Sequence, residues 1–379
     1  MPQSYRITTN GMFRTYRNNL MKNTTRLNKT MITVQTQRKF NTYAEDPVSA
    51  SNAWRLRRSY WRTGDQIDNN NHIISKYESA WAAMDAIVDG NSDHPGLDGI
   101  LAAVEGLSDT SGSGRVSLGQ QLIATSENIV AMMNSKYGDD FIFSGADGAN
   151  IPFQWSGNTL LYRGIDVSTP KTSYQTSDFV DKGGKLDQAK YDKAKEEYET
   201  ENPGYEFEDA LKLNDMAHET TYVDIGLGMK EDERGNLIKD SAFNSALSGL
   251  NFLGYGKDEN LAVIVRELGT IFSRADPDSG EYKSTADKER ATKLLDALHS
   301  AVRDAQGQHV ELDANAKYLK TNLQQLTVSK EQLNMQIMDT ESMDPAEAIT
   351  EMTWAQYCYN AALRIGTNIL SQSLIDYMN

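Results

Sequence analysis

Residues 312–337 read LDANAKYLKTNLQQLTVSKEQLNMQI and hold the most regular hydrophobic pattern of the chain. Positions spaced alternately four and three residues apart are apolar with one exception, and they are Leu312, Ala316, Leu319, Leu323, Leu326, Lys330, Leu333 and Ile337. This spacing keeps one apolar stripe on a single side of a helix, as a coiled coil requires. The run has neither Gly nor Pro, so we predict one helix of about 37 Å that is buried against other helices.

A second regular stripe lies earlier in the chain and also steps by three and four residues. It comprises Ile67, Asn70, Ile74, Tyr77, Trp81, Met84 and Val88. Two stripes of similar regularity are natural partners in one helical bundle. We therefore predict that the helix over 67–88 packs against the helix over 312–337.

The two chain ends carry weaker stripes, which polar residues interrupt. Near the start the stripe is Phe13, Arg17, Leu20, Thr24, Leu27, Met31 and Val34. Helices of this kind are marginal alone and gain stability only by packing. We predict that both ends form an assembly interface with other subunits, with these candidate residues: Leu20, Leu27, Met31, Val34, Met352, Tyr359, Leu363, Leu370 and Leu374.

Two Asp-Pro pairs mark expected helix starts. Asp46 can cap a helix N-terminus, and Pro47 then takes the first helical position, where its missing N–H costs nothing. Asp344 and Pro345 repeat this arrangement before the last stripe. Each pair therefore divides a weak end segment from a regular one.

The middle of the chain, residues 141–240, lacks the regular helical stripes and has a different sequence pattern. FIFSG (141–145), LLYRG (160–164) and TYVDIGLG (221–228) read as short strands with hairpin turns, whereas YDKAKEEYE (191–199) is compatible with a helix. Helical patterning resumes over 243–253 and 261–272.

The predicted fold class is mainly α. A long antiparallel helical bundle or coiled coil is formed by both chain ends, and it carries an inserted β-rich (α+β) domain. The predicted domains are 1–44 with 340–379 as tube-forming terminal helices, 45–140 with 241–339 as a helical rod, and 141–240 as an outer domain.

Composition limits the functional classes. The 379 residues are 39% hydrophobic and 24% charged, no apolar run has the length of a membrane span, and the start lacks the apolar region of a cleaved secretory signal. The single Cys358 excludes an internal disulfide and a cysteine zinc cluster.

The net charge of −15 conceals an asymmetry between the ends. Residues 1–62 carry twelve Lys or Arg against two acids, and residues 310–379 carry four against nine. The basic residues are spread without a clustered tract, so we expect neither nucleic-acid binding nor membrane insertion. The asymmetry favours ends that attract each other or neighbouring subunits.

Enzymatic motifs are incomplete. HETTY (218–222) lacks the second His of a zinc site, because Tyr222 stands where the spacing requires it. DPDSG (276–280) begins like a calcium loop, but Glu281 occupies the position of the required Gly, so a plain turn is favoured. We expect no catalytic residue, no metal site and no cofactor.

Four stretches carry a resemblance to a known family. RITTNGMF (6–13), EDPVSASNA (45–53), FIFSGADGANIPF (141–153) and AALRIGTNILSQSLIDYM (361–378) resemble the flagellin superfamily, and its hook-associated junction branch more closely than filament flagellin. The resemblance covers about the first 150 and last 130 residues and leaves the middle domain unmatched.

This resemblance implies a structural adaptor that joins the flagellar hook to the filament. It implies export through the flagellar type III apparatus to an extracellular location, self-association in a ring, and as partners another hook-associated subunit, flagellin and an export chaperone. Two alternatives stay open: a filament-forming flagellin, and a flagellin-like subunit whose inserted domain binds a surface partner.

Overall fold

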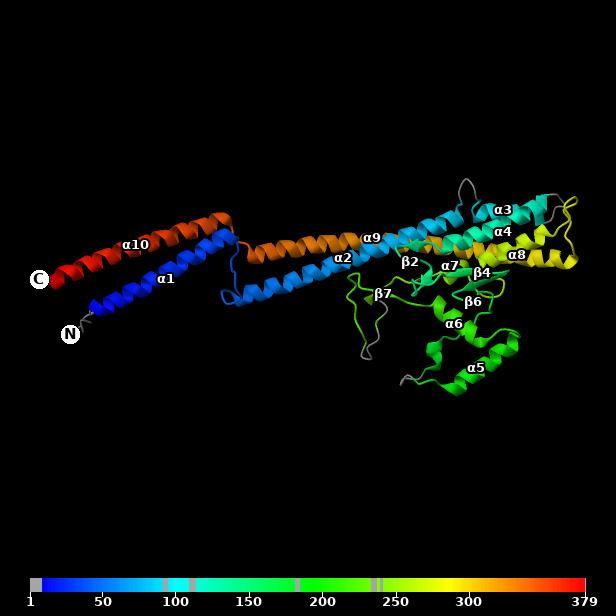
Figure 1. The fold of residues 1–379 in the computed structure, drawn as a ribbon, viewed down its shortest axis with the longest axis horizontal. Helices are drawn as coiled ribbons and strands as arrows, with labels where there is room; N and C mark the ends of the chain where they lie inside the picture. The colour runs from blue at the N-terminus through cyan, green and yellow to red at the C-terminus, as the bar shows by residue number, and fades with distance from the viewer. Residues whose placement is uncertain are drawn as a thin grey trace. The chain divides into compact units, whose positions relative to one another are not determined.

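The computed structural model describes residues 9–90, 95–108, 114–180, 185–232, 237–238 and 241–378. It divides into two compact units: Met1–Asp65 with Leu326–Asn379, and Gln66–Gln325. Long helices at both ends and a small sheet-containing insert confirm the predicted fold class (Figure 1). The unit boundaries fall inside two long helices, so the predicted three-part division stays a prediction.

The helices of the described residues are α1 (Thr9–Thr36), α2 (Pro47–Val88), α3 (Leu97–Ser108), α4 (Gly114–Met133), α5 (Gln188–Glu201), α6 (Phe207–Ala217), α7 (Gly249–Leu253), α8 (Leu261–Ser273), α9 (Thr285–Glu341) and α10 (Pro345–Met378). The predicted helix over 312–337 is confirmed as part of α9, which spans 57 residues. The stripe at 67–88 lies within α2.

In the unit Gln66–Gln325, the two regular stripes pack against each other. Lys320 of α9 pairs with Glu78 of α2 at 2.8 Å, and His309 stacks on Trp81 with ring centroids 5.3 Å apart. Because the α9 numbers fall as the α2 numbers rise, the helices are antiparallel. The stripe residues of α9 in this unit lie inside the core, namely Leu312, Ala316 and Leu319, with Leu323 packed against it.

Helices α4 and α8 approach each other closely through two glycines. A Cβ atom added to Gly119 would lie 2.5 Å from the backbone nitrogen of Ser273 and 2.8 Å from the carbonyl oxygen of Gly269. The two backbones leave no room for a Cβ atom at this contact. The helices can therefore pack this closely because glycine occupies both positions.

Short strands lie in the insert and in the segments that flank it. They are β1 (Lys136–Tyr137), β2 (Asp140–Phe141), β3 (Ser144–Gly145), β4 (Phe153–Ser156), β5 (Thr159–Tyr162), β6 (Ile165–Asp166), β7 (Tyr222–Val223), β8 (Phe243–Asn244) and β9 (Leu247–Ser248). The sheet β4-β5-β6 is antiparallel, while β3 pairs with β9 and β7 with β8. The β3–β9 pair brings the start of the insert next to the segment that follows its end.

The helix predicted over 243–253 is wrong for most of its length. Residues 243–244 and 247–248 are strands, and only Gly249–Leu253 is helical. The apolar spacing of this stretch fits a helix, but pairing with β7 and β3 provides its backbone hydrogen bonds instead. The predicted helix over 191–199 is confirmed within α5.

A second, smaller core lies within the insert. It is built by α5, α6 and the 3₁₀ turn Thr176–Phe179, and it contains Phe179, Ala194, Tyr198, Phe207, Ala210 and Leu211. Because this part of the insert is helical and separately packed, the sheets account for only part of the predicted β-rich domain.

Replacement of Gly119 by Val tests the close α4–α8 approach. We expect this overpacking to destabilise the protein by about 1–3 kcal/mol, measured as the free energy of unfolding in urea. Gly307→Ala in α9 is the control, because a Cβ there meets nothing within 4 Å; we expect it to be neutral or stabilising by up to about 1 kcal/mol. Equal effects of both variants would contradict the close approach.

Tyr162 provides a pH test of the insert. Burial raises its pKa to about 12, and its hydroxyl donates to the carbonyl oxygen of Phe143 at 3.0 Å. The folded state therefore holds this proton more tightly than the unfolded state, and stability is lost as pH rises above about 10. Between pH 8 and 11 we expect the free energy of unfolding, measured in urea, to fall by about 1.4 kcal/mol more in the wild type than in Tyr162→Phe. An equal fall of the free energy of unfolding in both proteins would contradict the burial of this hydroxyl.

Candidate assembly surface

The two chain ends meet in the unit Met1–Asp65 with Leu326–Asn379, where α1 and α10 lie side by side and run antiparallel (Figure 1). Tyr16 of α1 rests on Gly366 of α10 so closely that a methyl group at Gly366 would overlap the phenol ring. The contact sets the register of one helix against the other.

Backbone hydrogen bonds hold the other end of the pair. The Met343 N–H donates to the carbonyl oxygen of Gln37 at 3.0 Å, and the Lys39 N–H donates to that of Glu341 at 2.7 Å. The Arg57 guanidinium forms a bidentate ion pair with the Glu341 carboxylate. Such a bidentate pair fixes orientation as well as distance.

Both Asp-Pro pairs stand at helix starts. Helix α2 begins at Pro47, and the Asp46 carboxylate accepts the Ser49 N–H at 3.0 Å. Hydrogen bonds from Ser49 lower the pKa of Asp46. Helix α10 begins at Pro345, and the Asp344 carboxylate accepts the Ala346 N–H at 2.8 Å.

Small and polar residues dominate the buried interface between α1 and α10. Ala348, Ala355 and Gly366 are buried on α10, and Thr30 and Thr33 are buried on α1. Both threonine hydroxyls donate to carbonyls of their own helix, so these two buried hydroxyls are satisfied. This pairing buries few large side chains.

The predicted interface residues divide into three groups. Leu20, Leu27, Val34, Met352 and Tyr359 are half-buried. Met31 and Leu363 are exposed. The side chains of Leu370 and Leu374 lie outside the described residues. The structure describes one chain, so the part that these residues play in assembly stays a prediction.

Several large exposed side chains of the pair are not among the predicted interface residues. Trp354 and Tyr357 stack on each other and are 55% and 66% exposed. The other exposed hydrophobic residues of these helices outside the predicted set are Met12, Met21, Ile32, Ile349 and Ile365. A search for aromatic residues off the stripe, three positions apart, would have found the stacked pair.

A groove of about 600 Å³ opens between the two helices. Its lining combines small residues of α10 with larger apolar ones, and it consists of Met12, Thr15, Tyr16, Asn19, Lys22, Asn23, Tyr357, Cys358, Ala361, Ala362 and Ile365. A concave apolar surface with few polar groups suits an apolar side chain from a partner better than a reacting substrate.

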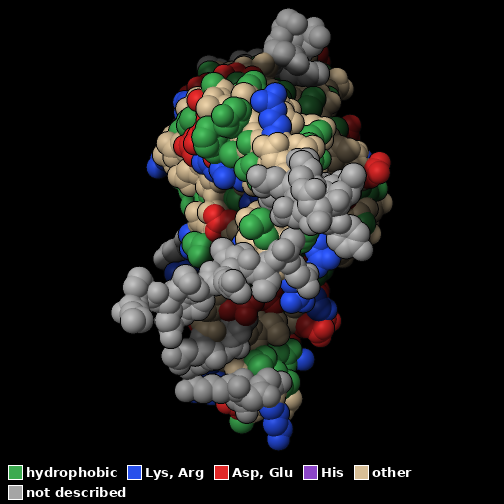
Figure 2. All heavy atoms as spheres, turned by 90° about the vertical axis from the view of Figure 1, so that its left-hand side faces the viewer, with side chains coloured by type: hydrophobic (Ala, Val, Ile, Leu, Met, Phe, Trp, Pro, Cys, Tyr) green, Lys and Arg blue, Asp and Glu red, His purple; other side chains and the backbone are tan. Residues whose placement is uncertain are grey.

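The surface of α1 is basic. The helix carries Arg14, Arg17, Lys22, Arg26 and Lys29, all exposed, and has no acidic residue. Figure 2 shows hydrophobic side chains reaching the surface among Lys, Arg and acidic side chains on the face that it displays. This mixture is typical of protein interfaces, where charge directs the partner and apolar area contributes affinity.

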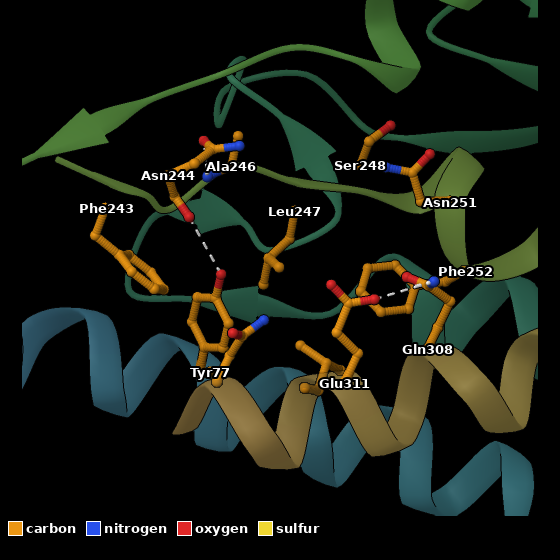
Figure 3. Close-up of a pocket in the computed structure, with 12 residues that line it drawn as sticks. Tyr77, Phe243, Asn244, Ala246, Leu247, Ser248, Asn251, Phe252, Gln308 and Glu311 are labelled. Carbon is orange, nitrogen blue, oxygen red and sulfur yellow. Dashed lines mark hydrogen bonds between the residues drawn. The ribbon is translucent and has the colours of Figure 1, made fainter. Parts of the chain in front are cut away.

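A separate cavity of about 340 Å³ lies where the segment 243–252, which follows the insert, meets α2 and α9 (Figure 3). The Tyr77 hydroxyl donates to the carbonyl oxygen of Asn244 at 3.4 Å, and Gln308 donates to Glu311 at 3.4 Å. Burial raises the pKa of Tyr77, so this hydroxyl stays protonated and acts as a donor. The cavity therefore resembles an anchoring point of this segment more than a reaction site.

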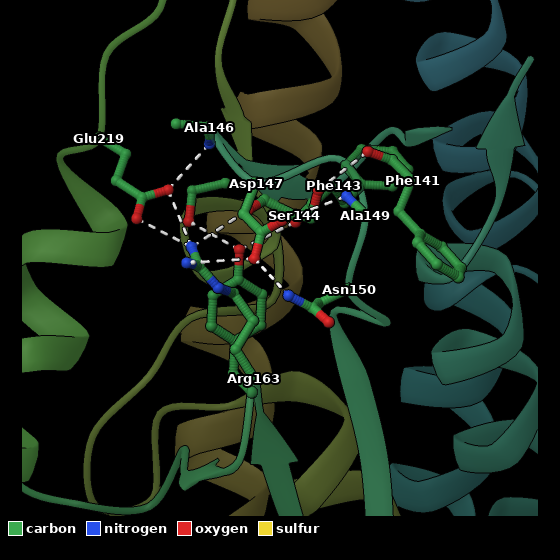
Figure 4. A network of polar contacts seen from close by, with 11 residues as sticks. Phe141, Phe143, Ser144, Ala146, Asp147, Ala149, Asn150, Arg163 and Glu219 are labelled. Carbon is green, nitrogen blue, oxygen red and sulfur yellow. Dashed lines mark hydrogen bonds and ion pairs between the residues drawn. The ribbon is translucent and has the colours of Figure 1, made fainter. Parts of the chain in front are cut away.

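A polar network holds the loop that follows FIFSG (Figure 4). Arg163 donates to Glu219 at 2.8 Å and lies 3.5 Å from Asp147, while the Ala146 N–H donates to Glu219 at 2.8 Å. A hydrogen bond from Asn150 lowers the pKa of Asp147, and Arg163 adds to this effect. The Glu219 of HETTY is therefore engaged in fixing this loop.

The remaining motif residues have structural partners. The ring of His218 is hydrogen-bonded to the carbonyl of Asn214 at 2.8 Å, and Asp276 accepts the N–H groups of Asp278 and Ser279 in a turn. Within the described ranges, the acidic, His and Cys side chains form no group able to hold a metal ion. In the same part of the chain, no helix combines the length and hydrophobicity needed to cross a membrane.

Comparison with known proteins concerns the fold. A solved structure named as a flagellar hook-associated protein from Vibrio parahaemolyticus matches with a TM-score of 0.51 and 12% identity, covering 79% of this chain and 100% of that one. No protein-family model and no curated protein matches the chain. The chain therefore shares the fold of a flagellar hook-associated protein.

Proposed function

We propose that this chain is a structural subunit of the bacterial flagellum, and specifically a hook–filament junction subunit of the kind called flagellar hook-associated protein 3. The observation that carries the proposal is the α1–α10 pair: each helix already has a partner, and large hydrophobic side chains remain exposed on both. The shared fold and the resemblance of the chain ends support it.

The physical argument concerns what assembly would bury. A fully buried large apolar side chain contributes about 1.5–3 kcal/mol relative to an exposed one. Burial of Trp354, Tyr357 and Ile349 would therefore favour association strongly. The small buried residues Ala348, Ala355 and Gly366 of α10 give the isolated pair little stability. Folding of the ends would then be coupled to packing with neighbours.

The proposal includes the route and the partners that the resemblance implies. The subunit is exported through the flagellar type III apparatus with the help of a chaperone, and it assembles outside the cell. There it forms a ring between another hook-associated subunit and flagellin. Its role is mechanical and it is not an enzyme; the engagement of Glu219 and Tyr77 in structural hydrogen bonds supports this.

Deletion of the gene in the source bacterium tests the junction role. We expect hooks without filaments in electron micrographs and flagellin lost to the medium, because the adaptor between the two lattices is missing. Complementation with the wild-type gene is the control. Normal filaments in the deletion strain would contradict the proposal, and long filaments formed by the purified protein alone would favour a filament flagellin instead.

Gly366→Leu tests the α1–α10 pair. The new side chain would collide with Tyr16, so we expect the amount of protein retained in isolated flagellar structures to fall at least tenfold, measured by immunoblotting. The free energy of urea unfolding of the unit Gln66–Gln325, measured in the full chain, should not change. Asn360→Leu, at an exposed position of the same helix, is the control, and equal retention of both variants would contradict the role of the pair.

A further inference from the structure

Amide side chains of α2 and α9 hold the segment that follows strand β7. Gln66 of α2 donates to both oxygens of the Asp224 carboxylate at 3.1 Å, and Asn69 donates to the carbonyl oxygen of Asp224 at 3.1 Å. From α9, Asn322 donates to the carbonyl oxygen of Ile225 at 2.7 Å. The segment is therefore fastened to both helices at once, and all five residues belong to the unit Gln66–Gln325.

We call residues 224–228 the strap. Its Ile225 side chain is fully buried and belongs to the core of the unit, whereas Leu227 is largely exposed. Gly226 and Gly228 have φ angles of 91° and 81°, in the left-handed region that glycine adopts without strain. The strap thus has one buried side chain and, directly after it, two positions where the backbone can rearrange easily.

A buried carboxamide without a partner lies beside the points where the strap is fastened. Asn70 of α2 directly follows Asn69, lies one helical turn after Gln66 and is 0% exposed. Among the residues that the structure describes, neither the nitrogen nor the oxygen of its side chain has a hydrogen-bond partner. Such a group destabilises the state that buries it, because it gives up its hydrogen bonds to water and gains none in return.

Another buried asparagine of the same unit shows the usual arrangement. Asn260 at the start of α8 is also buried, but its side chain accepts the Val263 N–H at 3.1 Å and donates to the carbonyl oxygen of Gly254 at 2.7 Å. Burial of this amide is therefore compensated, as buried polar groups usually are. The position of Asn70 lacks this compensation.

We propose that the strap is a latch that opens by itself while the core of the unit stays folded. Opening exchanges the hydrogen bonds from Gln66, Asn69 and Asn322 for bonds to water, and it gives water access to Asn70. The first change opposes opening and the second favours it, so opening costs much less than unfolding the core. This inference rests on the fold alone and does not depend on the flagellar role.

The moving part is short. Before the strap, Tyr222 and Val223 of β7 pair with β8 and keep the chain attached when the latch is open. The contact between Glu78 of α2 and Lys320 of α9 involves no residue of the strap and persists in both states. The latch is therefore a releasable attachment between the insert and the helix pair.

Thiol labelling measures the opening directly. Cys358→Ala removes the native thiol, and Ile225→Cys then places a single thiol on the buried position of the strap. Leu268→Cys in the same background is the control, because Leu268 is buried equally well in α8. The labelling rate with a soluble aromatic disulfide is measured in the full chain at low urea concentrations.

We expect the thiol of Ile225→Cys to react at least 100-fold faster than that of Leu268→Cys. Its rate should not depend on urea, because opening of the strap exposes little surface, whereas the rate for Leu268→Cys should rise with urea. Equal rates with equal urea dependence would overturn the inference, because the strap would then open only when the core unfolds.

Two further variants test the cause of the opening. In the Ile225→Cys background, Asn70→Leu should slow labelling at least tenfold, since the closed state no longer buries an unpaired amide. Asn322→Ala should speed labelling about fivefold, the equivalent of one hydrogen bond. Labelling that stays unchanged or changes in the opposite direction in either variant would overturn the inference.

Asn260→Leu is the matched control for Asn70→Leu. In chains without the added thiol, Asn70→Leu should raise the midpoint of urea unfolding, whereas Asn260→Leu should lower it because its amide has partners. A lowered midpoint in both variants would mean that the Asn70 amide is satisfied in the closed state, and it would overturn the proposed latch.

Discussion

The contact between the Tyr16 phenol and the bare backbone of Gly366 determines how the two ends of the chain meet. Any larger residue at position 366 would displace α1, and the levels of all side chains on both helices depend on this register. The hydrogen bond from the Met343 N–H to the carbonyl oxygen of Gln37 fixes the opposite end of the pair. Two segments that are far apart in sequence thereby become one surface.

Hydrophobic burial is distributed unevenly over the chain. In the unit Gln66–Gln325, the stripes of α2 and α9 and the glycine contact of α4 with α8 enclose a continuous core. In the α1–α10 pair, alanine, glycine and threonine occupy the buried positions while Trp354 and Tyr357 are exposed. A protein that must leave its ends available for neighbours is expected to have this distribution, because a fully buried end would have no surface to offer.

The regular helices could be predicted from sequence because their burial is local and periodic. The stripe of α9 is an example: Leu312, Ala316, Leu319 and Leu326 are all buried. Periodicity failed at 243–253, where strand partners far away in sequence decided the backbone conformation. It also did not reveal the small core around Phe179 and Phe207, which depends on contacts between a turn and two helices.

The candidate surface was predictable only in part for a related reason. A stripe search finds residues that face one partner, and it selected Leu20, Leu27 and Tyr359, which are half-buried between the two helices. The groove faces another direction. It becomes visible only when both helices are placed side by side, since its lining comes from α1 and from α10.

Amide hydrogen exchange of α1 and α10, compared between the free subunit and isolated flagellar structures, tests the central claim most directly. If these ends are assembly elements, their amides exchange rapidly in the free subunit and become strongly protected in the assembled state, while the amides of α4 and α8 are protected in both. Equal protection of α1 and α10 in both states would contradict the account.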